Sequence, residues 1–349
     1  MKSKYEQIAK QYRRKIQTSQ PGRRIPSIRQ IGQAAGVSQF TVQRAMNLLE
    51  EEGYITRHSG VGMYSAHPEE TPRGEKTRRR ILILTPQEWS SDILTMIQRV
   101  LSERGFLSVL RRYDLQDSPA RWIPRVQFDG IVFIGWFSSE MTSVLRKKRT
   151  PFVAQGLPYS NHPNIDCTCG DERLAGTMAA RHLIQLGHTK IAVLVHEPHN
   201  PDIIERVRGF TNEARLQNVS AEILDCRMAW GEDARIRAKQ MIEERLAAGA
   251  LSFTGLFSVG DTGAASVLQA FYEHGIKVPD QVSVIGVDDL PESAYLCPAL
   301  TTLAFDPRDR AEAVVDILER RFNGDDAVRI TKMFDPVLIE RKSTAPPLQ

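Results

Sequence analysis

Hydrophobic and polar positions recur with helical spacing in residues 26–53, PSIRQIGQAAGVSQFTVQRAMNLLEEEG. The first part predicts a short helix, whose apolar stripe consists of Ile28, Ile31, Ala34 and Ala35. Gly36 ends that helix, and Ser38 is the expected N-cap of a second one. The apolar positions of the second helix recur at i, i+3, i+4 and i+7 and are Val42, Ala45, Met46 and Leu49. The stretch therefore predicts a helix-turn-helix.

The flanking segments extend this pattern over the first 66 residues. Residues 3–17, SKYEQIAKQYRRKIQ, place apolar and aromatic side chains on one helical face and basic side chains around the others. The segment PGRRIPS that follows is a turn by its proline and glycine content. Residues 51–66, EEGYITRHSGVGMYSA, indicate two strands joined by a glycine turn, which is a β-wing. Residues 67–79 are polar and unpatterned, so we expect a linker there.

From residue 80 onward, short apolar runs alternate with amphipathic helices. RILILT at 80–85 precedes SSDILTMIQRVLSERG, and similar pairs recur as far as VSVIGV at 282–287. Strands that are buried on both faces and alternate with helices are typical of parallel sheets with crossover connections. There are more of these units than one sheet usually holds, so we expect two sheets. The predicted fold class is α/β, with one domain at 80–342 and a C-terminal tail at 343–349.

Charge is distributed unevenly along the chain. Residues 1–80 carry 16 Lys and Arg against 7 Asp and Glu, a net +9, and the remaining residues carry −5. A basic first part indicates an anionic partner for that part alone. The sequence shows neither a secretory signal nor a long apolar run, which predicts a cytoplasmic protein without a membrane segment. The cysteines at 167, 169, 226 and 297 are expected to be free thiols, and neither a metal nor a cofactor is expected.

The polar face of the second helix in the helix-turn-helix is rich in amides. Gln39, Gln43 and Asn47 lie on this face, and Phe40 and Arg44 lie beside it. Gln and Asn pair with adenine edges in the DNA major groove, where the phosphates would repel carboxylates. A helix that reads DNA is the favoured interpretation, and a helical hairpin with a neutral surface is the alternative.

Residues 1–66 resemble the winged-helix domain of GntR-type transcription regulators. The matching motifs are YEQIA near the start, PG-R-IPS-R at 21–29, VS-x-x-TV-x-RA at 37–45, LEEEGYI and the G-x-G of the wing at 60–62. The resemblance implies DNA contacts from the PS-x-R arginine, the start of the recognition helix and the wing tip. With the neighbouring Arg44, the candidate DNA-binding residues are Arg29, Ser38, Gln39, Thr41, Gln43, Arg44, Ser59 and Gly60. Arginines are frequent in the family at positions 39 and 43, so its guanine contacts are not expected here.

Residues 80–342 resemble the effector domain of LacI/GalR-type repressors, which is similar to periplasmic sugar-binding proteins. The matching motifs are GDERLAG at 170–176, AARHLIQLGHTKIAVL at 179–194, R-x-RGF at 206–210, LFSVGD at 256–261, AASVLQAFYEHGIKVPDQVSVIGVDD at 264–289 and PALTTL at 298–303. Matches are dense from residue 170 onward and sparse before residue 165. The resemblance implies a two-lobed domain with two parallel sheets and a ligand site between the lobes.

Ligands of open α/β sheets bind beyond the carboxyl ends of the strands. From that rule and the resemblance, the candidate effector-binding residues are Arg206, Trp230, Asp288, Asp261, Trp89 and Trp136. Arginine and aspartate can hold vicinal hydroxyls, and a tryptophan face covers the apolar side of a sugar ring. The alternatives are an ion pair for Arg206, a helix N-cap for Asp261 as for Asp171, and core or surface positions for Trp89 and Trp136. Asparagine is often found at position 260 of sugar-binding members, and Gly260 leaves the sugar's identity open.

The two resemblances together predict a sequence-specific DNA-binding transcription regulator. Its domain order resembles the arabinose-repressor type, which implies a homodimeric repressor on a palindromic double-stranded operator, controlled by a sugar or sugar derivative. The alternative is a GntR-headed fusion enzyme acting on a small metabolite. That alternative requires a larger body and a Schiff-base lysine, neither of which is found. HExxH, GxSxG and GxxxxGK[ST] motifs are also missing from the sequence, so no enzymatic activity is expected.

Overall fold

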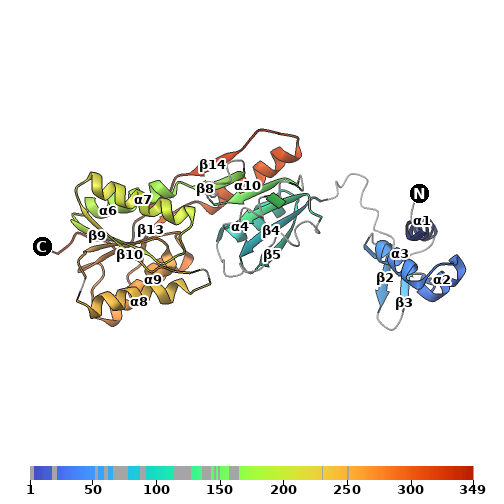
Figure 1. Ribbon diagram of the computed structural model, residues 1–349, viewed down its shortest axis with the longest axis horizontal. Coiled ribbons are helices and arrows are strands. Elements are labelled where there is room, and N and C mark those ends of the chain that lie inside the picture. Colours follow the sequence, from blue (N-terminus) through green and yellow to red (C-terminus); the bar gives the residue numbers. More distant parts are fainter. Residues whose placement is uncertain are drawn as a thin grey trace. The chain divides into compact units, whose positions relative to one another are not determined.

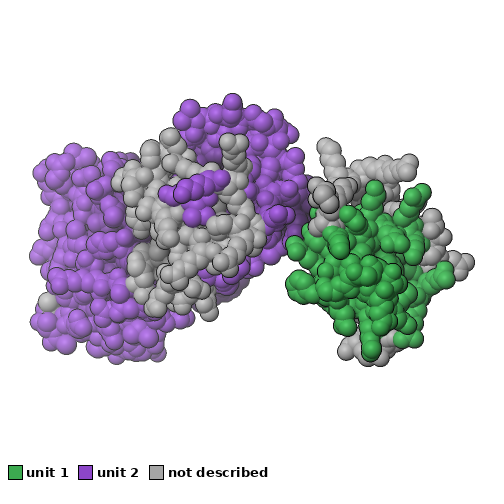
Figure 2. All heavy atoms as spheres, turned by 45° about the vertical axis from the view of Figure 1, so that its right-hand side comes forward, with its two compact units in different colours: residues 1–77 green, residues 78–349 purple. Residues whose placement is uncertain are grey.

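The chain forms two compact units, residues 1–77 and 78–349, which Figure 2 colours green and purple. The computed structural model describes residues 4–17, 22–51, 54–58, 62–65, 78–86, 92–113, 127–135, 143–144, 147, 150–156, 165–229, 231–249 and 251–348. Each unit has its own hydrophobic core. No helix among these residues is both long and apolar enough to cross a membrane.

The first unit is a winged helix-turn-helix. Its elements are α1 (Lys4–Gln17), β1 (Arg24–Ile25), α2 (Ile28–Ala35), α3 (Gln39–Glu51), β2 (Ile55–His58) and β3 (Gly62–Ser65). The strands form an antiparallel sheet in the order β1-β3-β2 (Figure 1). Ser27 caps α2 through a capping box with Gln30, and Gly36 ends that helix with a left-handed φ of 62°.

The core of the first unit lies where α3 packs against α1 and α2. All four apolar positions predicted for α3 are fully buried, which confirms the periodic pattern. In α2, Ile31 is buried and Ile28 is half-buried, but Ala34 and Ala35 are exposed. The expected stripe of α2 is therefore wrong at its end, because this helix has only eight residues and its last turn runs past the core.

The first lobe of the second unit is built on a parallel sheet in the order β14-β8-β7-β6-β4-β5. Its strands are β4 (Arg80–Pro86), β5 (Leu107–Tyr113), β6 (Gly130–Ile134), β7 (Phe152–Gln155), β8 (Asp166–Gly170) and β14 (Thr331–Phe334). Helices α4 (Asp92–Glu103) and α10 (Pro307–Phe322) pack together against the sheet, and their apolar sides share one core (Figure 1).

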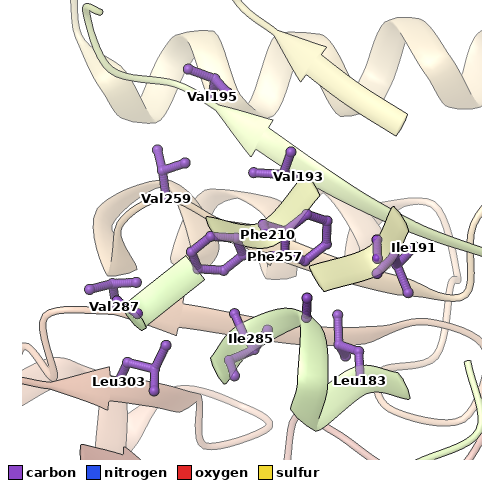
Figure 3. Packing of buried hydrophobic residues seen from close by; sticks show 14 of the residues in the cluster. Leu183, Ile191, Val193, Val195, Phe210, Phe257, Val259, Ile285, Val287 and Leu303 are labelled. Carbon is purple, nitrogen blue, oxygen red and sulfur yellow. The ribbon is translucent and has the colours of Figure 1, made fainter. Parts of the chain in front are cut away.

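The second lobe has the sheet order β10-β9-β11-β12-β13-β15, which is parallel except for the last pair. Its elements are α6 (Glu172–Gln185), β9 (Lys190–Val195), α7 (Pro201–Leu216), β10 (Ser220–Asp225), α8 (Ala234–Ala247), β11 (Gly255–Ser258), α9 (Asp261–Glu273), β12 (Ser283–Val287), a 3-10 helix (Pro291–Tyr295), β13 (Thr301–Ala304) and β15 (Val337–Ile339). Figure 3 shows the core on one side of the sheet, where Phe210 and Phe257 stack with ring centroids 5.3 Å apart. The predicted α/β fold with two mainly parallel sheets is confirmed.

The chain passes between the two lobes at residues 170–172, 304–307 and 334–337, where one sheet or its covering helix gives way to the other. The last part of the chain returns to both lobes. Strand β14 pairs with β8 in the first sheet, and Ser343 is fully buried in the second lobe, where its Oγ accepts from the Thr301 N–H. Residues 343–345 therefore belong to the packed second lobe.

One strand of the first sheet is not marked by an apolar run in the sequence. Residues 166–170, DCTCG, form the fully buried strand β8. The polar Asp166 hides the strand from an apolar pattern, but the Arg321 guanidinium donates two hydrogen bonds of 2.6 Å to its carboxylate. A buried carboxylate is tolerated when such a pair satisfies it, so hydrophobicity alone cannot identify this strand.

Candidate functional site

The amide-rich face of α3 is held in place at its start by a local cap. Ser38 Oγ accepts a hydrogen bond from the Thr41 N–H at 3.3 Å and lies 2.9 Å from Thr41 Oγ1, which confirms Ser38 as the cap. Gln43 donates to Asn47 Oδ1 at 2.9 Å. Gln39 is exposed and Gln43 is half-buried, so both side chains are accessible at the surface of α3.

Two of the predicted DNA-binding arginines are exposed on the first unit. Arg29 lies in the first turn of α2, and the Arg44 guanidinium stacks over the Tyr5 ring at 4.3 Å from its centroid. This contact fixes the Arg44 stem against α1 while its charge stays at the surface. The wing-tip candidates Ser59 and Gly60 lie outside the described residues.

The second candidate site is organised by the crossing of α6 and α7. A Cβ atom on Gly176 would stand 1.9 Å from the Arg206 carbonyl oxygen, and one on Gly209 would stand 1.9 Å from the Arg173 carbonyl oxygen. Two glycines therefore allow the helix backbones to touch. This close approach brings the first residue of α6, Glu172, within reach of the Arg206 side chain.

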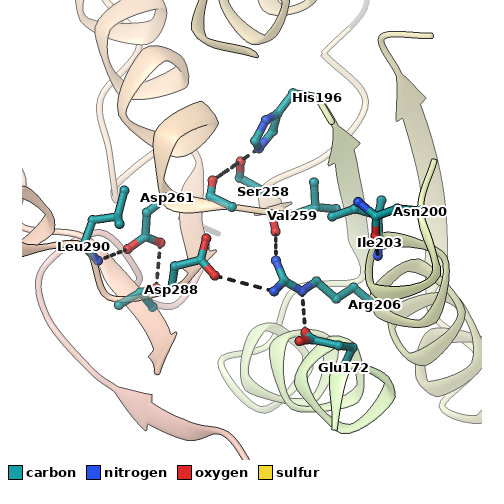
Figure 4. Close-up of polar contacts among 12 residues, drawn as sticks. Glu172, His196, Asn200, Ile203, Arg206, Ser258, Val259, Asp261, Asp288 and Leu290 are labelled. Atoms are coloured by element: carbon teal, nitrogen blue, oxygen red, sulfur yellow. Dashed lines mark hydrogen bonds and ion pairs between the residues drawn. The ribbon is translucent and has the colours of Figure 1, made fainter. Parts of the chain in front are cut away.

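Arg206 is 7 % exposed and is held by three acceptors (Figure 4). Its Nε donates to Glu172 Oε2 at 2.6 Å, and its Nη1 donates to the Val259 carbonyl at the end of β11. Its Nη2 lies 3.5 Å from Asp288 Oδ1. The Glu172, Asp288 and Glu197 carboxylates raise the pKa of Arg206 against the opposing effect of burial, so the guanidinium stays charged.

Asp288 follows β12 and keeps 40 % of its side chain exposed. Its backbone has a φ of 112°, outside the usual regions, and its N–H donates to the Leu303 carbonyl at 2.8 Å. Its recessed position among protein atoms raises the pKa of Asp288 to about 7, against the lowering effect of Arg206. The structure thus brings together two of the predicted effector residues, a buried guanidinium and an accessible carboxyl group.

Asp261 has a different position from the one expected. It is 1 % exposed, and it is the first residue of α9 rather than its N-cap. Ser293 Oγ and Thr302 Oγ1 each donate to its carboxylate at 2.6 Å. The Leu290 N–H donates to it at 3.1 Å (Figure 4). These three bonds tie α9 to β13 and to the segment after β12, so the carboxylate is occupied inside the protein. Burial raises the pKa of Asp261 to about 7.

The three tryptophans and Asp171 are the other residues that the sequence singled out for this site. Trp89, Trp136 and Trp230 lie outside the described residues. Asp171 caps α6 by accepting from the Leu174 N–H at 2.8 Å, as the N-cap alternative predicts. Sequence reasoning missed Glu172, although its place at the start of a helix beside a motif glycine was a usable signal.

A second carboxylate that sequence reasoning missed is Glu197. It lies two residues after the end of β9, which is where an open α/β sheet binds ligands. Its Oε1 lies beside Gly260, close to Asp288. Among the described residues, no cluster of three or more His, Cys, Asp and Glu could hold a metal ion.

Comparisons with known proteins identify both units. A family model of "Bacterial regulatory proteins, gntR family" matches residues 4–64, and one of "Periplasmic binding protein-like domain" matches residues 180–344. The HTH-type transcriptional regulator GalR of Escherichia coli K12 is 25 % identical over 339 residues, which cover 93 % of this chain and 97 % of that protein. The HTH-type transcriptional repressor PurR of Vibrio atlanticus is 25 % identical and covers 91 % of this chain and 98 % of its own.

Solved structures agree with this assignment. A LacI family regulator of Enterococcus faecium, with bound ribose, has a TM-score of 0.67 at 23 % identity and covers 78 % of this chain and 100 % of its own. A LacI family regulator from Burkholderia phymatum has a TM-score of 0.65 at 26 % identity and covers 76 % of this chain and 99 % of its own. The structure of the regulator CelR in complex with cellobiose has a TM-score of 0.67 at 17 % identity and covers 91 % of this chain and 100 % of its own.

The first unit, called the head below, matches DNA-binding regulators, and the second unit, called the body, matches a periplasmic binding protein-like domain. Together they define a DNA-binding transcription regulator, not an enzyme. More specifically, the chain is a GntR-type helix-turn-helix domain fused to a periplasmic-binding-protein-like domain, and its homologues are LacI/GalR-family regulators.

Proposed function

We propose that this regulator is a repressor controlled by a carbohydrate effector that binds between the two lobes and contacts Arg206 and Asp288. The observation that carries the proposal is the pair itself: a buried guanidinium lies 3.5 Å from a carboxyl group that remains accessible at the carboxyl end of β12. Donors and acceptors side by side are what adjacent hydroxyl groups require, because each hydroxyl both donates and accepts.

The position of the pair supports a site between the lobes. Asp202, in the first turn of α7, has its Oδ2 3.4 Å from the position that a Cβ atom on Gly156 would take. Gly156 directly follows β7 of the first lobe, so the two sheets bring their carboxyl ends toward the same region. A ligand there would contact both lobes and change their relative positions. Sugars bound by relatives, such as the ribose and cellobiose of the solved structures, are consistent with this class of effector.

We further propose that the regulator acts in the cytoplasm as a homodimer on a palindromic operator. Two winged helices bind two half-sites only at a fixed separation, so a change between paired bodies alters operator occupancy. A coupling free energy of about 1–3 kcal/mol between effector and DNA suffices for regulation. The similar proteins GalR and PurR are an HTH-type transcriptional regulator and an HTH-type transcriptional repressor, which supports this mode of action.

On the DNA side, we propose that Gln39 and Gln43 read adenines and that basic side chains of the head contact phosphates. The two glutamines are four residues apart and lie on one face of α3. The outer surface of α1 adds Lys10, Arg14 and Lys15, which line one shallow depression. Phosphate contacts fix the position of the helix, and amide contacts to base edges give sequence preference.

A selection of binding sites from random DNA tests the proposed base contacts. Gln39→Ala should relax the preference at one A·T position of the half-site, by about 1–3 kcal/mol against the wrong base. Glu50→Gln is the control, because Glu50 is exposed near the other end of α3. A Gln39→Ala protein that selects the same sequence as the wild type would refute this assignment.

Asp288→Asn tests the proposed effector contact. Asparagine tolerates positive φ values and fits the same space, so the fold should persist. The sugar is the one among ribose, galactose and cellobiose that stabilises the wild type. The variant should need about a 10–100-fold higher concentration of that sugar for the same change in operator binding, because a hydrogen bond to a charged group is lost. Operator affinity without sugar should be unchanged. The control is Asp280→Asn, in the exposed turn before β12. An unaltered sugar response in Asp288→Asn would remove Asp288 from the site.

A further inference from the structure

The carboxylate of Glu197 occupies the space that Gly260 leaves open. A Cβ atom on Gly260 would stand 2.8 Å from Glu197 Oε1, 3.4 Å from Asp288 Oδ2 and 3.5 Å from His196 Cε1. The backbone of Gly260 has a φ of −160°, which any residue adopts. Its conformation therefore does not require glycine, and the reason for glycine is the space that the neighbouring carboxylates use.

Glu197 is half-buried, and the described part of the chain gives it no hydrogen bond and no ion pair. Burial raises the pKa of its carboxyl group, and so do the nearby Asp202 and Glu172, while Arg206 lowers it. Its oxygens are not among the fully buried atoms that lack a partner, so the carboxylate stays accessible to a ligand. A residue in this position is best satisfied by a ligand that brings hydrogen-bond donors.

Negative groups dominate this region. Glu172, Glu197, Asp202 and Asp288 all act electrostatically on Arg206 or on one another. Three N–H groups of the Arg206 guanidinium are already directed at protein acceptors. Burial lowers the pKa of His196 to about 4, so its ring adds no positive charge at neutral pH. Arg310 is a second cation, besides Arg206, that lowers the pKa of Asp288.

We propose that Glu197 is a specificity-determining residue of the effector site: through the space beside Gly260 it accepts hydrogen bonds from hydroxyl or ammonium groups of the effector and excludes anionic sugars. The proposal rests on the proposed effector site and narrows its ligand class. An uncharged or amino sugar supplies donors to Glu197 and Asp288 together. A uronate or sugar phosphate places a like charge against several carboxylates and has few free cationic donors to compensate.

Thermal denaturation of the full-length protein with matched sugars tests this specificity. The probes are galactose, galactosamine, galacturonate and galactose 6-phosphate, with the corresponding glucose and ribose derivatives. Within a set that binds, the neutral or aminated member should raise the melting temperature and its anionic counterparts should not. Binding by an anionic member with none by its neutral counterpart overturns the proposal.

Glu197→Gln separates the role of the carboxylate from its shape. The variant should bind the neutral sugar at least about tenfold more weakly, since a hydrogen bond to a charged group is lost, and should discriminate less against the anionic sugar. Without ligand it should melt at or above the wild-type temperature, because repulsion among carboxylates is relieved. Glu243→Gln, on the surface of α8, removes the same charge elsewhere and is the matched control.

Two results would overturn the role of Glu197: wild-type affinity for the neutral sugar in Glu197→Gln, or a lower melting temperature of that variant without ligand. The latter would mean that Glu197 stabilises the fold instead. Operator binding by the same proteins is measured in parallel. If the wild type does not bind operator DNA, the proposed regulatory mechanism is refuted. The sugar selectivity is measured by thermal denaturation without DNA, so it is tested independently.

Discussion

The ion pair between Glu172 and Arg206 should contribute far more to stability than its neighbours on the same helices. Glu172 is 3 % exposed and Arg206 is 7 % exposed, so Glu172→Gln leaves a buried guanidinium with one compensating charge fewer. Breaking a buried pair costs about 3–5 kcal/mol, and the glutamine oxygen still accepts from Nε, which favours the lower end. For a body of this size, about 3 kcal/mol corresponds to a fall in melting temperature of about 6–12 °C.

Glu205→Gln is the internal control for this prediction. Glu205 pairs with Arg173 of α6 and with Arg208 of its own helix, and those arginine side chains are 57 % and 60 % exposed. Exposed pairs contribute about 1 kcal/mol at most. Calorimetry of the full-length variants would separate the melting of the body from that of the head. Equal losses in both variants, or no loss in Glu172→Gln, would refute the reasoning that burial decides the strength of these pairs.

Two further predictions concern the same lobe. Gly209→Ala should lower the free energy of unfolding by about 1–3 kcal/mol or more in urea titrations, because its Cβ would stand 1.9 Å from a backbone oxygen of α6; a neutral effect would show that the two helices separate freely. Asp261 should make stability depend on pH. Its pKa is about 7 when folded and about 4 when unfolded, so its stabilising contribution is full below about pH 4 and is lost as the pH rises through about 7. The wild type should therefore lose more stability than Asp261→Asn between pH 5 and 8, and parallel losses would contradict this.

The sequence predicted those parts of the structure in which pattern and burial coincide. The apolar positions of α3 are all buried, because a helix that packs on one side must repeat its apolar residues every three to four positions. Alternation of strands and helices likewise predicted both sheets of the body. The motif around Arg206 indicated an arginine that the structure places beside Asp288, and its contact with an effector stays a prediction.

The features that the sequence did not predict depend on contacts between residues that are distant in the chain. A carboxylate after a strand can point inward or outward, and Asp261 points inward because Ser293 and Thr302, distant in sequence, donate to it. Strand β8 can contain the buried Asp166 because Arg321 of α10 donates hydrogen bonds to its carboxylate. The carboxylate of Glu197 occupies space left by the missing side chain of Gly260, which is 63 positions away. Each of these depends on long-range contacts.

The glycine crossing of α6 and α7 has a mechanical consequence. Helix α6 begins at Glu172, directly after the chain crosses from the first lobe at residues 170–172. Because α6 and α7 are in backbone contact at Gly176 and Gly209, a movement of the chain at residues 170–172 would displace Glu172 and, through their hydrogen bond, Arg206. One hydrogen bond thus separates Arg206, the proposed effector contact, from a segment that connects the lobes, so effector binding and the angle between the lobes would be coupled through Glu172.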